Sequence, residues 1–392
     1  MDFQQLIDSE QYFQKIKQHD NIVVYGAGNK ARETVKLLEQ KGICPDAVCD
    51  GNQALWGKEF LGKYRISSYE EMKKTLYNYC ILICTTINTA VQIIEELREK
   101  GETAPMIHVS NLFKVDSCLL GTNEIKQDFD RYAAVYDLLE DDLSKTVYVH
   151  NLNSKITGNL LPLYELMDGE TFFDKKILGQ VHPQEVYVDA GAYTGDTLCR
   201  FIAYSGGEYE KAIAFEPDES NFQALKNFVK YGVVERTRLV NVGLWSERAK
   251  KQFYTVVDNS ELYFESPNLF RKVEDIADNS TMQTCNDQSL NVGAKEVITD
   301  CLDNLLEDEN PTLIKVNALA ADLPILQGCE KTLKRCVPDI VMEYGVRPDY
   351  LLGEIEFLNR LNLGYRFYMR QKNIFHDSKT VLYAISDKRA VR

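Results

Sequence analysis

Short, continuously apolar runs alternate along this chain with longer segments in which apolar residues recur at helical spacing. In the N-terminal part, residues 22–25, 79–85 and 106–109 read as buried strands, and a shorter strand is expected at 47–49. Residues 31–41 and 89–100 read as helices that end at a glycine. This order predicts a small Rossmann-like α/β domain, which we place over residues 1–116.

The same alternation returns on a larger scale after residue 184. Strands are expected at the following ranges: 186–189, 212–216, 239–242, 251–257, 313–316 and 338–344. Helices are expected at 321–333 and 350–361, and two β-rich runs, 365–369 and 380–385, read as an antiparallel pair at one sheet edge. Residues 184–392 are therefore expected to form a second, larger α/β domain.

The segment between these domains has a different composition. Residues 117–183 are polar and acidic with interspersed tyrosines, and 128–139 and 141–156 fit helices. We expect a helical connector rather than a flexible linker.

A glycine-rich turn with the sequence VYVDAGAYTGDT occupies residues 186–197. An apolar strand leads into Asp189, Gly191 and Gly195 bracket a turn, and an amphipathic helix follows, presenting unpaired N–H groups to a ligand. The next strand ends in Glu216, where a nucleoside-binding α/β sheet places the acid that accepts the ribose hydroxyls. The alternative is a glycine turn that serves only helix–strand packing.

VDAGAYTGDT and the later AFEPDESN together resemble the first two motifs of the FkbM family of S-adenosylmethionine-dependent methyltransferases, and the likeness spans residues 184–385. The resemblance implies a class I methyltransferase sheet with an antiparallel edge pair, and S-adenosylmethionine as cofactor. It also places Trp245 beside the adenine, although a Trp at a strand end is often core. The implied cofactor-binding residues are Asp189, Gly191, Tyr193, Gly195, Asp196, Thr197, Glu216, Pro217 and Trp245.

The acceptor side departs from the family pattern. Where relatives read close to I-K-M-D-I-E-G-A-E, residues 314–322 read I-K-V-N-A-L-A-A-D, so Asn317 and Leu319 replace the two inner carboxylates. Methylation of a hydroxyl needs a group that removes its proton, which an asparagine cannot do. The base is then expected among Asp322, Glu343 and Lys315, with Asn317 beside the acceptor. The family's histidine after the fifth strand is also absent, because Tyr344 is followed by Gly345.

A second glycine loop opens the N-terminal domain. Gly26, Gly28 and Asn29 follow the first strand, and Asp50 lies roughly 20 residues further on, as in a Rossmann unit. The domain resembles N-terminal modules of enzymes of bacterial surface-polysaccharide synthesis, which implies a nucleotide or nucleotide-sugar ligand. The alternative is a purely structural role or a role in forming a homodimer.

Length, net charge and residue composition exclude several classes of protein. A length of 392 residues favours two domains, and a net charge of −14 argues against nucleic acid as the substrate. No stretch is apolar enough to span a bilayer, and the N-terminus does not resemble a signal peptide, so a cytoplasmic location is expected. Ten cysteines without a C-x-x-C pair and five scattered histidines give no zinc-type spacing, which leaves a carboxylate-held Mg²⁺ open.

Three functions are compatible with these features. The leading hypothesis is an O-methyltransferase acting on a sugar or polysaccharide precursor. The second is a catalytically impaired binding or regulatory protein that keeps the methyltransferase fold, and the altered segment Asn317-Ala318-Leu319-Ala320 favours it. The third is a nicotinamide-dependent oxidoreductase centred on the N-terminal domain, which lacks a Tyr-x-x-x-Lys or catalytic histidine context.

Overall fold

The computed structural model describes residues 16–40, 42–109, 125, 127–157, 159–169, 171–232, 234–256, 292–318, 321–345, 350–374 and 377–387. The chain divides into two compact units, an N-terminal one of Met1–Phe129 with Val149–Leu166 and a C-terminal one of Asp130–Tyr148 with Met167–Arg392. The segment expected to be a connector thus contributes to both units.

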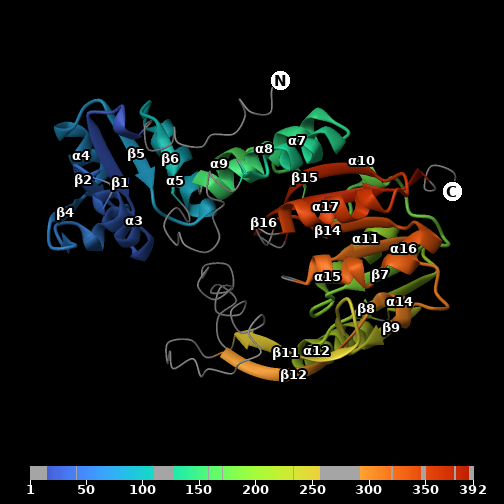
Figure 1. Ribbon diagram of the computed structural model, residues 1–392. Helices are drawn as coiled ribbons and strands as arrows, with labels where there is room; N and C mark the ends of the chain where they lie inside the picture. Colours follow the sequence, from blue (N-terminus) through green and yellow to red (C-terminus); the bar gives the residue numbers. More distant parts are fainter. Residues whose placement is uncertain are drawn as a thin grey trace. The chain divides into compact units, whose positions relative to one another are not determined.

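The N-terminal unit is built on a sheet of order β3-β4-β2-β1-β5-β6, drawn in blue and cyan in Figure 1. All its strands are parallel except β3, which pairs antiparallel with β4. The strands are β1 (Asn21–Tyr25), β2 (Ala47–Cys49), β3 (Glu59–Phe60), β4 (Tyr64–Ser67), β5 (Tyr79–Ile83) and β6 (Met106–His108).

Helices cover both faces of this sheet. Ile22 and Val24 point to the face on which α3 (Asn29–Gln40) packs, and Val23 points to the face covered by α4 (Tyr69–Thr75) and α5 (Ile87–Glu99). A short 3-10 helix, η1 (Gln53–Leu55), follows β2, and α9 (Leu161–Tyr164) contacts α5. The strand order around β1 is that of a Rossmann half.

The C-terminal unit is built on a seven-stranded sheet of order β15-β16-β14-β13-β7-β8-β9. β16 is antiparallel to both of its neighbours, while the other strands run parallel, which confirms the predicted antiparallel edge pair. The strands are β7 (Val186–Ala190), β8 (Lys211–Phe215), β9 (Thr237–Val240), β13 (Leu313–Val316), β14 (Asp339–Glu343), β15 (Arg366–Ile374) and β16 (Asp377–Ile385).

Both faces of this sheet are buried. Tyr187 and Leu313 point to a face where they share an apolar core with α10 (Lys175–Leu178), α11 (Asp196–Ser205) and α12 (Glu219–Tyr231). The alternate residues, such as Val188 and Ile314, are equally buried on the other face. The helices after residue 300 are α14 (Leu302–Leu305), α15 (Asp322–Gln327), α16 (Glu330–Cys336) and α17 (Tyr350–Arg360). The predicted α/β class I methyltransferase sheet is thereby confirmed.

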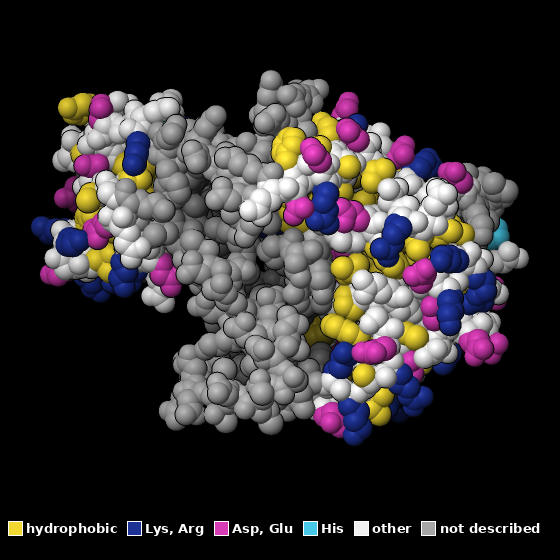
Figure 2. Space-filling view, viewed as in Figure 1, with side chains coloured by type: hydrophobic (Ala, Val, Ile, Leu, Met, Phe, Trp, Pro, Cys, Tyr) yellow, Lys and Arg dark blue, Asp and Glu magenta, His cyan; other side chains and the backbone are white. Residues whose placement is uncertain are grey.

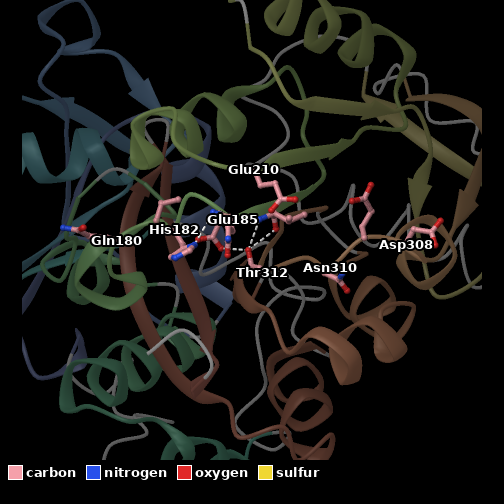
Figure 3. A pocket seen from close by; sticks show the side chains of 11 residues that line it. Gln180, His182, Glu185, Glu210, Asp308, Asn310 and Thr312 are labelled. Carbon is pink, nitrogen blue, oxygen red and sulfur yellow. Dashed lines mark hydrogen bonds between the residues drawn. The ribbon is translucent and has the colours of Figure 1, made fainter. Parts of the chain in front are cut away.

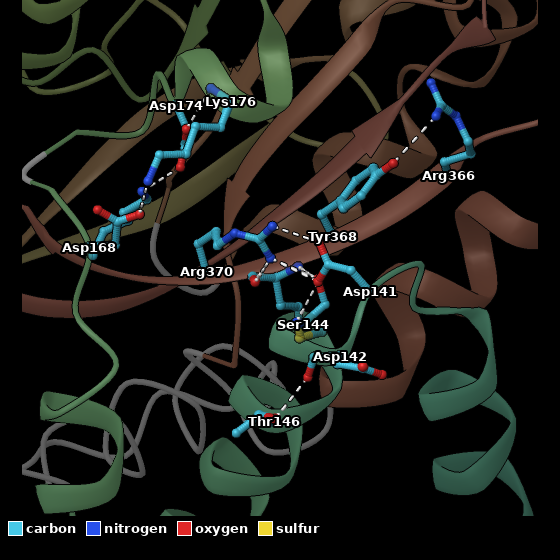
Figure 4. Close-up of polar contacts among 12 residues, drawn as sticks. Asp141, Asp142, Ser144, Thr146, Asp168, Asp174, Lys176, Arg366, Tyr368 and Arg370 are labelled. Atoms are coloured by element: carbon cyan, nitrogen blue, oxygen red, sulfur yellow. Dashed lines mark hydrogen bonds and ion pairs between the residues drawn. The ribbon is translucent and has the colours of Figure 1, made fainter.

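The outer edge of the sheet, strand β15, is covered by segments that precede the sheet in sequence (Figure 4). Short parallel bridges join Leu139 to Phe367 and Met167 to Gln371. The Arg370 guanidinium donates to Asp141, 2.6 Å away, which lies between α7 (Phe129–Leu138) and α8 (Asp142–Thr157). These contacts satisfy backbone groups that an open sheet edge would expose.

A three-stranded sheet of order β10-β12-β11 follows β9 in the chain, formed by β10 (Gly243–Leu244), β11 (Ala249–Val256) and β12 (Val292–Asp300). On the face drawn in Figure 2, basic and acidic side chains are intermingled over the described part of the C-terminal unit. Within the described residues, no helix is both long and apolar enough to cross a membrane.

Candidate functional site

The strand order of the C-terminal sheet reverses between β7 and β13, and ligands of open α/β sheets bind at the carboxyl ends of strands at such a point. Two buried residues of opposite charge meet there. Lys315 Nζ lies 2.9 Å from Asp189 Oδ1 and donates to the Gly191 carbonyl at 2.8 Å, while Asp189 Oδ2 accepts the Thr197 hydroxyl at 2.6 Å. One buried ion pair therefore joins β7, β13, the glycine loop and the start of α11.

The two glycines of this loop are required by chain packing. A β-carbon on Gly191 (φ +81°) would lie 2.1 Å from the carbonyl oxygen of Asn317, and one on Gly195 (φ +99°) would lie 2.6 Å from the Phe228 ring. The Asn317 N–H also donates to the Ala190 carbonyl at 3.0 Å. Packing thus accounts for both glycines, and it holds the loop against the residue expected beside the acceptor.

Glu216 follows β8 and is 5% exposed. Its Oε2 accepts the Tyr193 N–H at 2.9 Å and its Oε1 accepts the Asp218 N–H at 3.0 Å. Burial raises the pKa of this carboxyl, and backbone hydrogen bonds act against that shift. The Asn221 side-chain amide also lies 3.5 Å from Oε1. Oε2 can accept a further hydrogen bond, so the residue suits a ribose hydroxyl.

The other predicted cofactor residues are placed as follows. Tyr193 is 53% exposed with a left-handed φ of +49°, an unusual conformation that is often found at functional sites. Asp196 is the first residue of α11, and burial raises its pKa. Pro217 is half-buried beside Glu216. The ring of Trp245 has Lys251 Nζ 4.8 Å from its centroid, and its role beside the adenine stays a prediction.

On the acceptor side, Asp322 begins α15 with 1% exposure and accepts the Ala318 N–H at 2.9 Å. Burial, and to a smaller extent Glu343, raise its pKa to about 7, against the opposing charges of Lys315 and Lys379. Glu343 ends β14 and pairs with Lys379 at 2.8 Å. These groups thus lie within electrostatic reach of one another. Leu319 and Ala320 lie outside the described residues.

The contacts of Lys315 favour a positioning role over that of a general base. Its side chain is 1% exposed, and its ammonium donates to the Asp189 carboxylate and the Gly191 carbonyl. The geometry therefore favours Lys315 as a positioning residue for the glycine loop.

Three residues at this edge were not predicted from the sequence. Asn241, just after β9, donates to the Glu216 carbonyl at 2.9 Å, and Lys379 pairs with Glu343. The Phe172 ring lies 5.9 Å from Lys315 Nζ. A polar residue directly after a parallel strand, as at Asn241, is a usable sequence signal, whereas β16 brings Lys379 to its partner only through tertiary pairing.

A cavity of about 600 Å³ lies at the amino-terminal ends of the parallel strands of the same sheet (Figure 3). Its lining includes Val186 at the start of β7, Glu210 just before β8 and Thr312 just before β13. There the Glu185 carboxylate accepts the Thr312 hydroxyl at 2.6 Å. This cavity is therefore separate from the edge that carries Asp189 and Glu216. Among the described residues, no cluster of three or more His, Cys, Asp or Glu is suited to hold a metal ion.

In the N-terminal unit, the residues predicted for a second nucleotide site do come together. Gly26 and Gly28 follow β1, Asn29 begins α3, and the Asp50 carboxylate accepts the Ala27 N–H at 2.7 Å.

Most of the C-terminal unit matches a known protein family, and nearly the whole chain resembles a solved structure. Residues 189–367 match the family described as the methyltransferase FkbM domain. A solved structure of methyltransferase FkbM from Methylobacillus flagellatus KT aligns with 97% of this chain and 95% of its own, at 16% identity and a TM-score of 0.62. An rRNA methylase from Streptococcus thermophilus aligns with 57% of this chain and 91% of its own (15% identity, TM-score 0.30).

A precorrin-6y C5,15-methyltransferase from Geobacter metallireducens GS-15 aligns with 54% of this chain and 84% of its own (14% identity, TM-score 0.30). No curated protein matches the sequence significantly. The first of the solved structures shares the fold over nearly the whole chain, and the family match covers the glycine loop, Glu216, Lys315 and Asp322. Residues 189–367 therefore form an S-adenosylmethionine-dependent methyltransferase domain of the FkbM family.

Proposed function

We propose that the protein methylates a hydroxyl group of a sugar or polysaccharide precursor in the cytoplasm. The observation that supports this reaction most directly is the carboxyl group of Asp322 at the start of α15, whose pKa is raised to about 7 and which accepts the N–H of Ala318, the residue after Asn317. General bases work best when their pKa lies near the working pH. Asp322 thereby replaces the carboxylates that the altered motif lacks.

One set of residues binds the cofactor and another contacts the acceptor. Bound S-adenosylmethionine supplies an electrophilic methyl group. Glu216 accepts the ribose hydroxyls, and the Asp189–Lys315 pair holds the loop from Gly191 onward in place. On the acceptor side, the Asn317 amide orients the substrate hydroxyl and Asp322 accepts its proton.

A sugar is the class of acceptor that the molecule's charge and the family resemblance favour. A net charge of −14 and the intermingled charges in Figure 2 provide no extended basic surface for a nucleic acid on the described face. Recognition of a sugar hydroxyl requires no such basic surface.

The test is methyl transfer from S-adenosylmethionine with an isotopically labelled methyl group to a panel of nucleotide sugars and oligosaccharide precursors. The proposal predicts labelled product for at least one sugar with the wild type, and a loss of about 10²- to 10⁴-fold in Asp322→Asn. Ser220→Ala, an exposed change on α12, is the matched control and retains the rate. Label transferred to no sugar, or undiminished transfer by Asp322→Asn, contradicts the proposal.

A second function is favoured by the same altered segment. Asn317 cannot remove a proton, and Asp322 is 1% exposed, which suits a binding or regulatory protein that keeps the cofactor site without turnover. This alternative predicts S-adenosylmethionine binding without methyl transfer to any acceptor.

A further inference from the structure

The acid-and-loop arrangement around Glu216 occurs a second time, in the N-terminal unit. Asp50 Oδ2 accepts the Ala27 N–H of the glycine loop at 2.7 Å, as Glu216 Oε2 accepts the Tyr193 N–H at 2.9 Å. Asp50 Oδ1 accepts the N–H of Asn52, two residues further on, at 2.8 Å, and Glu216 makes the same bond to its own second neighbour. Both acids follow the second strand of a Rossmann-type sheet. The similarity therefore extends to individual hydrogen bonds of a site that suits a ribose.

An exposed aromatic side chain lies beside this acid. The Trp56 indole N–H donates to the Asp50 carbonyl at 2.7 Å, and the residue is 39% exposed. A Trp ring is a sequence-tolerant platform for stacking a nucleobase. A nucleoside with its ribose at Asp50 can therefore place its base against Trp56.

The two sites differ in the charge at the start of the helix that follows each glycine loop. The first turn of α3 contains Lys30 and no acidic residue, whereas the first turn of α11 contains Asp196. The N-terminus of α3 thus favours an anion, such as a phosphate group. A β-carbon on Gly28 would meet no atom within 4 Å, so the loop faces open space where such a group can approach.

An unpaired polar atom lies at the same edge of the sheet. His108 ends β6 fully buried, its Nε2 lies 3.0 Å from the Thr85 carbonyl, and its Nδ1 has no hydrogen-bond partner among the described residues. The Thr85 methyl group would be 3.3 Å from a β-carbon on Gly26, so this pair borders the glycine loop. A buried acceptor of this kind is satisfied when a ligand or an ordered water occupies the edge.

We propose that the N-terminal unit binds a nucleoside diphosphate or a derivative of one, with the ribose at Asp50, the base on Trp56 and the phosphates at Gly28 and the start of α3. This site is distinct from the S-adenosylmethionine site, and its ligand differs in bearing phosphate groups. The proposal does not depend on methyl transfer.

The test is calorimetric titration of the full-length protein with ADP and with UDP, in saturating S-adenosylhomocysteine so that the methyltransferase site is filled. Adenosine and inorganic pyrophosphate serve as probes of each half of the ligand. We expect ADP or UDP to bind at least about tenfold more tightly than adenosine or pyrophosphate, because two sets of contacts act together. Equal affinity for adenosine and ADP, or no binding of either nucleotide, overturns the proposal.

Variants locate the bound nucleotide. Gly28→Val places its side chain in open space and should fold normally, yet it should weaken ADP binding at least about tenfold by blocking the phosphates. Lys30→Met should weaken binding, while Lys36→Met, an exposed charge further along α3, should not. Trp56→Ala should weaken binding about tenfold and Trp56→Phe should restore most of it.

The controls separate this site from the methyltransferase site. Glu216→Ala should leave ADP binding unchanged. If Glu216→Ala abolishes ADP binding, or if Gly28→Val and Lys30→Met leave it intact, the nucleotide binds elsewhere and the proposal is wrong. Absence of methyl transfer in the same preparations would count against the proposed function alone.

Discussion

Lys315 and Asp189 form a buried ion pair at the carboxyl ends of two adjacent parallel strands, with 2.9 Å between the ammonium and the carboxylate. The Lys315 ammonium also donates to the Gly191 carbonyl, and the Asp189 carboxylate accepts from Thr197. The pair therefore joins the glycine loop and the start of α11 to the two strands.

Removing one partner of this pair should lower the free energy of unfolding. Lys315→Met leaves the Asp189 carboxylate buried without its counter-charge, which typically costs about 3–5 kcal/mol of unfolding free energy. The double variant Lys315→Met/Asp189→Asn should recover much of that loss, because no unpaired charge remains. Urea denaturation measures both, and a cost below about 1 kcal/mol for the single variant would show that the pair is not needed for the fold.

Two variants distinguish the destabilisation caused by the close approach of Gly191 to Asn317 from that caused by a left-handed backbone. Gly191→Ala introduces a β-carbon 2.1 Å from the Asn317 carbonyl oxygen, whereas Gly207 has a similar φ of +80° and no atom within 4 Å of such a carbon. Gly207→Ala should cost about 1–2 kcal/mol from its left-handed backbone alone. Gly191→Ala should cost about 1–3 kcal/mol more, and thermal unfolding of the two variants compares them directly. Equal destabilisation would mean that the two loops are free to separate.

The raised pKa of Asp322 predicts opposite pH effects on stability and on activity. Burial favours the neutral carboxyl in the folded state, so its contribution to stability is complete below its unfolded pKa of 3.8 and is lost as pH rises through about 7. Between those values, the folded wild type should lose up to about 1.4 kcal/mol per pH unit relative to Asp322→Asn. Turnover, by contrast, should rise through pH 7 as the base loses its proton.

The unfolding free energy is measured by denaturation and the turnover by initial rates, both in buffers from about pH 5 to about pH 8. If the stability of the wild type and of Asp322→Asn shows the same pH dependence, Asp322 titrates normally and is not the expected base.

Restoring a family carboxylate distinguishes the two proposed functions. In an active methyltransferase that uses Asp322, Asn317→Asp should leave turnover within a few-fold of the wild type, because a base is already present. Leu319→Glu combined with Asn317→Asp restores both inner acids of the motif. Activity that appears only in this double variant would support the catalytically impaired binding protein instead.

The order of elements could be predicted because buried parallel strands are continuous apolar runs, as at β7, β8 and β13. The acids that follow such strands, Glu216 and Asp50, could be located for the same reason. The predicted helix at 321–333 was wrong in one respect, since it is two helices, α15 and α16, that divide near Gly328. A β-carbon on Gly328 would lie 2.3 Å from the Trp245 carbonyl oxygen, a tertiary contact without a local signal.

The chemistry of individual side chains was less accessible from the sequence. The β3–β4 pair was missed because its strands are too short for a periodic pattern. The buried contact of Lys315 with Asp189 depends on the pairing of β7 with β13, which no residue spacing reveals.

The assignment of the S-adenosylmethionine site is tested by titrating the purified protein with S-adenosylmethionine and S-adenosylhomocysteine, and by repeating both titrations on Glu216→Ala, with Glu219→Ala as control. Glu219 lies on the exposed start of α12, three residues from the proposed ribose acceptor. We expect micromolar binding of both ligands by the wild type and by Glu219→Ala, and loss of that binding in Glu216→Ala. Well-folded wild-type protein that binds neither ligand would contradict the assignment of the cofactor site.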